Sequence, residues 1–195
     1  MGGIMSYLSQ ALAFLIETVF GLYIALVLLR FLLQLTHADF YNPFSQFLVR
    51  ATNPPLLPLR RAIPGFFGID VASAILLIVL EAIKIVLVVM VAQGLVPRIP
   101  GVFVMSFADL IQLTLYVLIG AVFVRVLASW ISPYNDHPLT DLAIHLTEPF
   151  MRPARRLLPL ISGIDLSPVI VVIVFELISI LVVQPLLAVG TSLLT

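Results

Sequence analysis

The sequence predicts an all-α membrane protein with four transmembrane helices from two parallel two-helix repeats, and with short amphipathic interfacial helices in the cytoplasmic loops. Three observations lead to this fold class. Hydrophobic residues make up 62% of the chain and charged residues 10%, whereas soluble domains have roughly 45–50% and about 25%. Four apolar segments are long enough to cross a bilayer. The second half of the chain also repeats a proline- and arginine-rich pattern of the first half.

The four spans are predicted from length and hydrophobicity. A transmembrane helix needs about 20 consecutive, mostly apolar residues. The segments that meet this requirement are Ala11–Leu35, Val71–Gln93, Asp109–Ile131 and Leu166–Val189. We therefore divide the chain into a first repeat, residues 1–100, and a second repeat, residues 101–195. Because each repeat has an even number of spans, the two repeats should run parallel across the membrane.

The distribution of arginines predicts the orientation. The loops after the first and third spans carry most of them, at Arg50, Arg60, Arg61, Arg152, Arg155 and Arg156. The connection between the repeats has only Arg98, and neither terminus contains a basic residue. Loops rich in Lys and Arg stay on the cytoplasmic side. We therefore expect both repeated loops in the cytoplasm and both termini on the outer side.

Each of these loops should begin with a short amphipathic helix. Pro43 and Pro138 hold equivalent positions in the two repeats, and proline suits the first turn of a helix. Apolar residues follow at helical spacing, including Phe44, Phe47 and Leu48 in the first loop. We expect these helices to lie in the membrane interface with their apolar faces toward lipid. Packing on the end of the helix bundle is the alternative.

A cluster of prolines comes next in each loop and should end the helix, because proline lacks a backbone N–H and restricts the residue before it. We expect an extended surface segment that contains Pro54, Pro55, Pro58 and Pro64, and in the second copy Pro149, Pro153 and Pro159. The pairs Arg60–Arg61 and Arg155–Arg156 lie inside it. Guanidinium groups bind phosphate in a bidentate manner. These arginines are therefore candidates for binding lipid headgroups or a partner, unless they only set the topology.

The tripeptide Gly-Ile-Asp closes both loops and places Asp70 and Asp165 directly before a span. A carboxylate at this position can cap the helix, because it accepts hydrogen bonds from the free N–H groups of the first turn. An ion pair with an arginine of the same loop, or with Arg30 or Arg125 near the ends of the first and third spans, is compatible with capping. We expect Arg30 and Arg125 to extend toward the lipid headgroups.

Glu81, Lys84 and Glu176 lie within predicted spans, where ionisable residues are costly and are candidates for function. Lys84 follows Glu81 by three residues and can pair with it, whereas Glu176 has no neighbouring cation in the sequence. Two interpretations are open. The charges fix the packing of neighbouring helices, or Glu81 and Glu176 face each other across the axis between the repeats as a proton or cation site. The second interpretation requires a homodimer or a larger assembly.

The repeated loop motif resembles the signature of a known family. Its pattern is Thr-x-Pro-x-x-x-Pro-x-Arg-Arg-x-x-Pro followed by Gly-Ile-Asp, and it spans residues 52–70 and again residues 147–165. This pattern is similar to that of the YGGT family of integral membrane proteins. The resemblance implies a bacterial inner-membrane protein, and the positive-inside distribution of arginines then puts both termini in the periplasm. The resemblance also implies a link to osmotic or ion tolerance or, as in plastid relatives, to cytochrome assembly and organelle organisation, and it carries over no catalytic residues.

The sequence therefore predicts a non-enzymatic assembly, scaffolding or envelope-homeostasis factor that uses no cofactor and no metal. Its expected partners are the lipid bilayer with its anionic headgroups, a membrane protein or a second copy of the chain. The chain has no cysteine, which excludes thiolate chemistry, and its zero net charge gives no reason to expect nucleic acid. The alternative is a small proton-coupled or ion-conducting transporter that uses Glu81, Lys84 and Glu176.

Overall fold

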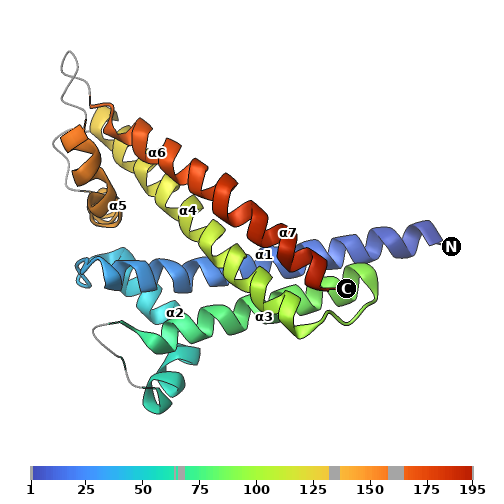
Figure 1. The fold of residues 1–195 in the computed structure, drawn as a ribbon. Helices are drawn as coiled ribbons and strands as arrows, with labels where there is room; N and C mark the ends of the chain where they lie inside the picture. The colour runs from blue at the N-terminus through green and yellow to red at the C-terminus, as the bar shows by residue number, and fades with distance from the viewer. Residues whose placement is uncertain (1, 64, 66–68, 132–136, 158–164, 195) are drawn as a thin grey trace.

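A computed structural model describes residues 2–63, 65, 69–131, 137–157 and 165–194 (Figure 1). These residues form α-helices and one π-helical turn. In chain order the elements are α1 (Gly2–Leu35), α2 (Pro43–Ala62), α3 (Val71–Gln93), α4 (Ile99–Ile131), α5 (Pro138–Leu157), α6 (Ser167–Ile178), η1 (Ser179–Val183) and α7 (Gln184–Leu194). The last three elements follow one another without a break and make one long helix.

The four predicted spans are confirmed. The helices that are long and apolar enough to cross a membrane are Tyr7–Leu35, Val71–Gln93, Ile99–Ile131 and Ser167–Leu194. The third span begins at Ile99 rather than at Asp109. Pro100 lies in its first turn, where the missing N–H would have no helical partner in any case. Asp109 consequently lies within the helix, and its carboxylate is 3.9 Å from the Lys84 ammonium group.

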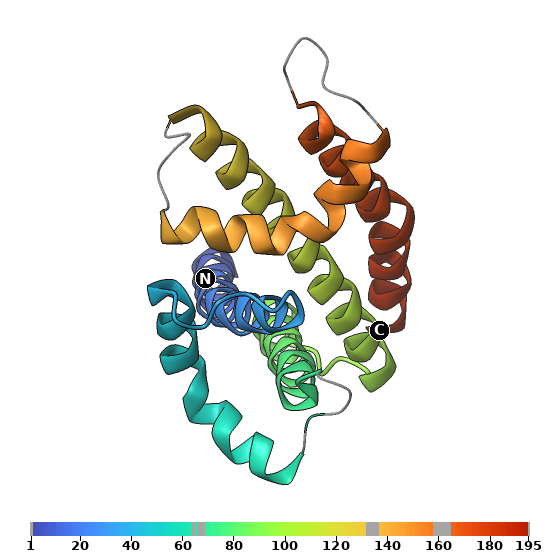
Figure 2. The same cartoon turned by 90° about the vertical axis from the view of Figure 1, so that its left-hand side faces the viewer.

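The spans form two hairpins that cross each other. α1 packs along α3 in the first hairpin, α4 packs along α6, η1 and α7 in the second, and α3 packs against α4 between them. Figure 1 shows α2 and α5 at one end of the molecule and both termini toward the other. Figure 2 faces the first of these ends, with α2 and α5 lying across the ends of the long helices. The two repeated loops therefore share one side of the bundle.

The helices pack in series and not around a simple twofold axis. α3 of the first repeat contacts α4 of the second, but among the described residues α6 has no equivalent contact with α1. α3 is therefore covered by neighbours on two sides, and α6 lies at the edge of the bundle. The expectation that equivalent residues of these two helices meet across an axis is wrong for this reason.

The amphipathic helices α2 and α5 are longer than expected. The structure contradicts the prediction of an extended segment, because most of the loop prolines lie inside a helix. These are Pro54, Pro55 and Pro58 in α2 and Pro149 and Pro153 in α5. Pro64 and Pro159 lie outside the described residues. Both arginine pairs consequently occupy the last turn of a helix, where cations favour the helix dipole.

Helix α2 tolerates a proline at position 55 because α1 supplies the missing donor. Pro55 has no N–H for the carbonyl of Ala51, which lies one turn earlier. The Tyr23 hydroxyl donates to this carbonyl oxygen instead, at 3.4 Å. At the equivalent positions the second repeat has Phe150, with an N–H of its own, and Leu118. Tyr23 therefore occurs in the first repeat, where Pro55 leaves the Ala51 carbonyl without an N–H donor, and the second repeat has no tyrosine at the equivalent position.

The π-helical turn η1 also precedes a proline. In a regular α-helix the ring of Pro185 would collide with the carbonyl one turn earlier. The wider turn closes with a bond from the Gln184 N–H to the Ser179 carbonyl. Helix α3 has Met90 at the position equivalent to Pro185, and it is α-helical throughout. The proline accounts for this difference between the repeats.

Candidate functional site

Arg30 fastens the first amphipathic helix to the first span. It lies on α1 and is only 4% exposed. Its Nη1 donates to Thr52 Oγ1 at 2.7 Å and to Asn53 Oδ1 at 2.9 Å, both on α2. The Thr52 hydroxyl donates in turn to the carbonyl of Leu48 at 2.6 Å. The expectation that Arg30 extends to the lipid headgroups is wrong, because polar groups of α2 cover it inside the protein.

Arg125 makes the equivalent contact in the second repeat. Its Nη1 donates to Thr147 Oγ1 at 3.0 Å, and its Nη2 lies 3.0 Å from Glu148 Oε2. Like Arg30, it is turned toward the amphipathic helix and does not extend freely toward headgroups. The repeats differ at the second partner, since Asn53 stands where the second repeat has Glu148. The buried arginine of the first repeat thus has neutral partners, whereas Arg125 has a carboxylate.

Arg60, the first arginine of its pair, binds the aspartate that begins the next span. It forms an ion pair with Asp70, whose side chain is 5% exposed. The Asp70 carboxylate also accepts the Ser73 N–H at 3.3 Å and thereby caps α3. Burial alone would raise the pKa of Asp70, but the hydrogen bonds from Arg60 and Ser73 outweigh it and hold this pKa below its usual value. Capping and ion pairing, which the sequence left open together, are both confirmed for Asp70.

Arg155 repeats the ion pair, with its Nε 3.0 Å from Asp165 Oδ2. The N-cap position of α6 is Leu166 and not the predicted Asp165, although the Asp165 carboxylate still accepts a free N–H of the first turn. Pro168 occupies the position from which α3 donates its N–H, and proline has none to give. The Asp165 carboxylate accepts the Ser167 N–H at 2.9 Å instead. Burial tends to raise the pKa of Asp165, and the bonds from Ser167 and Arg155 lower it below its usual value.

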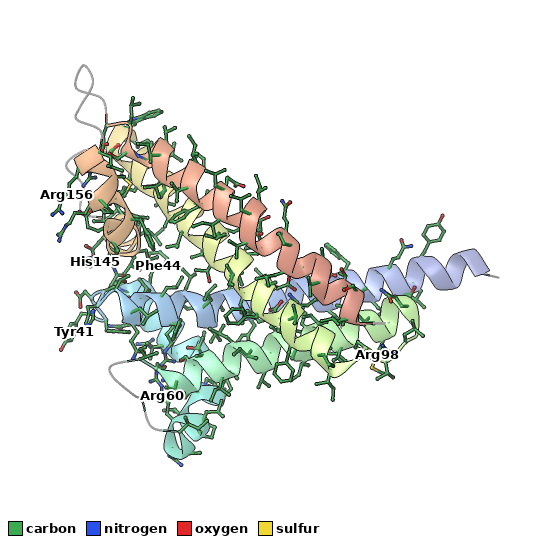
Figure 3. The ribbon with its side chains drawn as sticks, in the orientation of Figure 1. Tyr41, Phe44, Arg60, Arg98, His145 and Arg156 are labelled. Atoms are coloured by element: carbon green, nitrogen blue, oxygen red, sulfur yellow. The ribbon has the colours of Figure 1, made fainter. Side chains whose placement is uncertain are left out.

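The second arginine of each pair remains exposed. Arg61 and Arg156 have no hydrogen bond or ion pair within the part of the chain that the structure describes. Figure 3 shows Arg156 on the outer surface of α5, pointing away from the bundle. Arg50 and Arg152 are exposed at the same end of the molecule. We call these four residues the exposed arginines. Of these, Arg152 lies 4.0 Å from Glu148, whereas Arg60 and Arg155 pair with aspartates.

The two amphipathic helices are joined to each other. The Asn42 Nδ2 donates to the carbonyl of Pro138 at 2.8 Å, and its Oδ1 accepts the Phe44 N–H at 3.0 Å. His137 stands at the equivalent position, and its Nδ1 accepts the Leu139 N–H at 3.3 Å. Asn42 therefore begins one helix and holds the start of the other. α2 and α5 form one connected layer over the end of the bundle.

The charges within the spans do not form one site. Glu81 is 2% exposed and pairs with Lys84, as expected. Because Lys84 also lies 3.9 Å from Asp109, these charges link the two repeats where α3 meets α4. Glu176 is exposed on α6 and has no ion-pair or hydrogen-bond partner among the described residues. The hypothesis that Glu81 and Glu176 face each other is therefore wrong, and the contacts of Glu81 favour a role in helix packing.

Each Arg–Asp ion pair lines a hollow at the α2/α5 end. The smaller one has a volume of about 390 Å³ and is lined by Gln34, Arg60, Ile63, Gly65, Ile69 and Asp70. The larger one has a volume of about 740 Å³ and lies between α4, α5 and α6. Arg125, Arg155 and Asp165 provide its charged lining, while most other lining residues are apolar. The hollows at equivalent ends of the two repeats thus differ in volume and in the residues that line them.

The sequence prediction missed the residues that bind the buried arginines. Thr52 and Thr147 belong to the repeated motif, but their hydroxyls carry no charge and did not stand out. A usable signal exists, because each threonine follows its arginine by the same 22 residues, from Arg30 and from Arg125. A polar pair that recurs at a fixed separation in both copies predicts a contact that both copies need.

Comparison with known proteins identifies a family and several relatives of this chain. The CCB3/YggT family model matches the chain twice, at residues 9–91 and 104–186. An uncharacterised protein of Pseudomonas aeruginosa is 42% identical over 182 residues, which is 93% of this chain and 92% of the relative. The uncharacterised protein YggT of Escherichia coli is 38% identical over 185 residues, covering 95% of this chain and 96% of the relative. No solved structure matches the chain.

Proposed function

Because the chain belongs to the CCB3/YggT family, we propose that it is a non-enzymatic protein of the bacterial inner membrane that supports assembly or osmotic homeostasis of the envelope. It does so by holding α2 and α5 at the cytoplasmic face and presenting their exposed arginines to anionic lipid headgroups. The observation that carries this proposal is the division within each arginine pair. Arg60 and Arg155 bind aspartates, whereas Arg61 and Arg156 have no ion pair among the described residues.

The charge of the exposed arginines supports binding to an anionic surface. Each Lys or Arg near an anionic leaflet gains about 1 kcal/mol, and this gain weakens as salt screens the charges. The exposed arginines lie on two helices that are joined through Asn42 and Pro138. Because α2 and α5 lie at the same end of the molecule (Figure 1), these contributions add when that end meets a membrane.

The fixed position of α2 and α5 supports a role beyond topology. A loop that served only to orient the chain would need its positive charges but no defined structure. Here an arginine of a span in each repeat binds a threonine of the amphipathic helix, through Arg30 and Thr52 and through Arg125 and Thr147. These contacts hold the exposed arginines in a defined arrangement, as a surface for lipid or for envelope components would require.

Complementation tests the proposal. The double variant Arg61→Gln/Arg156→Gln should insert normally but fail to restore growth of a deletion strain under salt stress. The charge-preserving variant Arg61→Lys/Arg156→Lys should restore it, because the attraction to the leaflet depends on charge. If the glutamine variant is present in the membrane at the wild-type level and still restores wild-type growth, Arg61 and Arg156 are not required for the function.

The alternative function, ion or proton transport, has weaker support. It relied on two equivalent carboxylates in one site, but Glu81 is buried with Lys84 and Glu176 is exposed. Proteoliposomes separate the two functions. Ion or proton flux with the wild-type protein that disappears in Glu81→Gln would favour transport over the surface role.

A further inference from the structure

We propose that the larger hollow, between α4, α5 and α6, is a binding site for one zwitterionic phospholipid, with the phosphate at Arg125 and Arg155 and an acyl chain along the apolar walls. The inference rests on the proposed function in one respect, since that function puts this end of the bundle at the headgroups of the inner leaflet. The site itself is distinct from the exposed arginines, because neither Arg61 nor Arg156 lines it.

The walls of this hollow suit an acyl chain. Its volume of about 740 Å³ lies within the roughly 300–1,000 Å³ of typical ligand pockets. The apolar lining comes mainly from α4 and α6, through Val122, Phe123, Val126, Val169, Val172 and Ile173. Phe123, Val169 and Ile173 are 56%, 55% and 53% exposed, so the hollow opens sideways between two spans. In a bilayer, the molecules at that opening are lipids.

The polar lining lies at the depth of the headgroups. Arg155 and Asp165 stand between α5 and the start of α6, at the end of the span. Trp130, near the end of α4, also lines the hollow and is 78% exposed. Tryptophan is enriched at the membrane–water interface, where its ring meets the headgroups. The charged groups are thus at the interface, and the apolar walls extend from them along the spans.

The balance of charge favours a headgroup that carries both signs. Arg125 and Arg155 are bridged by Glu148, whose carboxylate oxygens lie 3.0 Å and 3.6 Å from them. Asp165 pairs with Arg155 from the other side. Arg152 also lies 4.0 Å from Glu148. The hollow is thus bordered by both guanidinium groups and carboxylates. A phosphate can bind the guanidinium groups while an ammonium group, as in phosphatidylethanolamine, binds a carboxylate.

The first repeat has no equivalent site among its described residues. Its hollow has about half the volume, and Arg30 does not line it. Its lining comes from the ends of helices and not from the apolar faces of two spans. The structure therefore predicts one lipid per chain and not one per repeat.

Lipid titration with native mass spectrometry tests the inference. The protein is stripped of lipid in mild detergent and titrated with dioleoyl phosphatidylethanolamine. The wild type should bind one lipid per chain. Val169→Trp, which fills the hollow without changing its charge, should weaken this binding about tenfold or more, and Arg155→Gln should weaken it similarly by removing one phosphate donor.

Matched variants serve as controls. Val174→Trp changes another exposed valine of α6 that does not line the hollow, and Arg156→Gln removes the neighbouring arginine that is outside it. Both should bind the lipid like the wild type. Absence of a bound lipid on the wild type, or equal binding by Val169→Trp and Val174→Trp, would overturn the inference.

The outcome is separable from that of the proposed function. Dioleoyl phosphatidylglycerol should not bind the hollow more tightly than the ethanolamine lipid, because it has no ammonium group to pair with the Asp165 carboxylate. Binding of the whole protein to anionic vesicles should instead depend on Arg61 and Arg156. A preference for phosphatidylglycerol that disappears in Arg156→Gln would assign the bound lipid to the exposed arginines and refute a site in the hollow.

Discussion

Replacing Asp70 with alanine should destabilise the protein by about 2–3 kcal/mol, whereas Asp165→Ala should cost about 1 kcal/mol or less. Loss of an N-cap costs about 1 kcal/mol. A hydrogen bond to a charged group contributes about 1.5–3 kcal/mol, and we take the lower end because the Arg60 side chain is 34% exposed. Asp70 itself is 5% exposed and makes both interactions.

Asp165 provides the matched comparison because it holds the same position in the second repeat. Its side chain is 33% exposed and that of Arg155 is 40% exposed, so the pair resembles a surface ion pair worth less than about 1 kcal/mol. The N-cap position of α6 belongs to Leu166, so Asp165→Ala removes the acceptor of the Ser167 N–H but not the N-cap residue itself.

Reversible unfolding in mixed micelles, followed by circular dichroism as the denaturing detergent is increased, measures both variants. Asp70→Asn, which retains an acceptor for the Ser73 N–H, should fall between wild type and Asp70→Ala. Equal losses for Asp70→Ala and Asp165→Ala, or a larger loss for the second, would show that burial and capping do not decide the strength of this motif.

Two further predictions use the same unfolding assay, and a third uses thermal unfolding at varied pH. Tyr23→Phe should cost about 0.5–1.5 kcal/mol, because it leaves a carbonyl of α2 without a donor, and an unchanged midpoint would contradict the account of the helical prolines. Gly101→Val should cost about 1–3 kcal/mol, since a Cβ would lie 2.5 Å from the Leu194 nitrogen, whereas Gly120→Val, with nothing within 4 Å, should be tolerated. The depressed pKa of Asp70 makes its stabilising contribution complete above the unfolded value of about 3.9 and lost as the pH falls through the lower folded value. Thermal stability should therefore fall below about pH 4 in the wild type and less steeply in Asp70→Ala, and parallel curves for the two proteins would contradict the assignment.

The repeat made much of the candidate site predictable. The recurrence of Arg60 and Asp70 as Arg155 and Asp165 indicated a contact that both halves share, and the structure has this ion pair in both. The pairing of Glu81 with Lys84 followed from their spacing on one helical face. These interactions are local, or lie between segments adjacent in the chain, so sequence spacing carries the information.

The prolines of α2 show why residue propensities alone predicted the wrong structure for this segment. Proline disfavours a helix interior on its own, and this effect predicted an extended segment. In the folded protein a hydroxyl from another helix, Tyr23 on α1, binds the carbonyl that Pro55 leaves free. Such compensation comes from a residue distant in the sequence. Propensity alone therefore predicted the wrong backbone.

The sequence by itself determined that this chain spans a membrane, where its spans lie, that it consists of two copies of one unit and that its arginine-rich loops share a side. Hydrophobic length, charge and internal repetition are properties of the chain before it folds, so they can be read directly. The tertiary structure alone decided which arginine of each pair is exposed and which carboxylate is buried. In a series of four packed helices only the inner spans have neighbours on two sides, and so Glu81 on α3 is covered by a neighbouring helix while Glu176 on α6 is not.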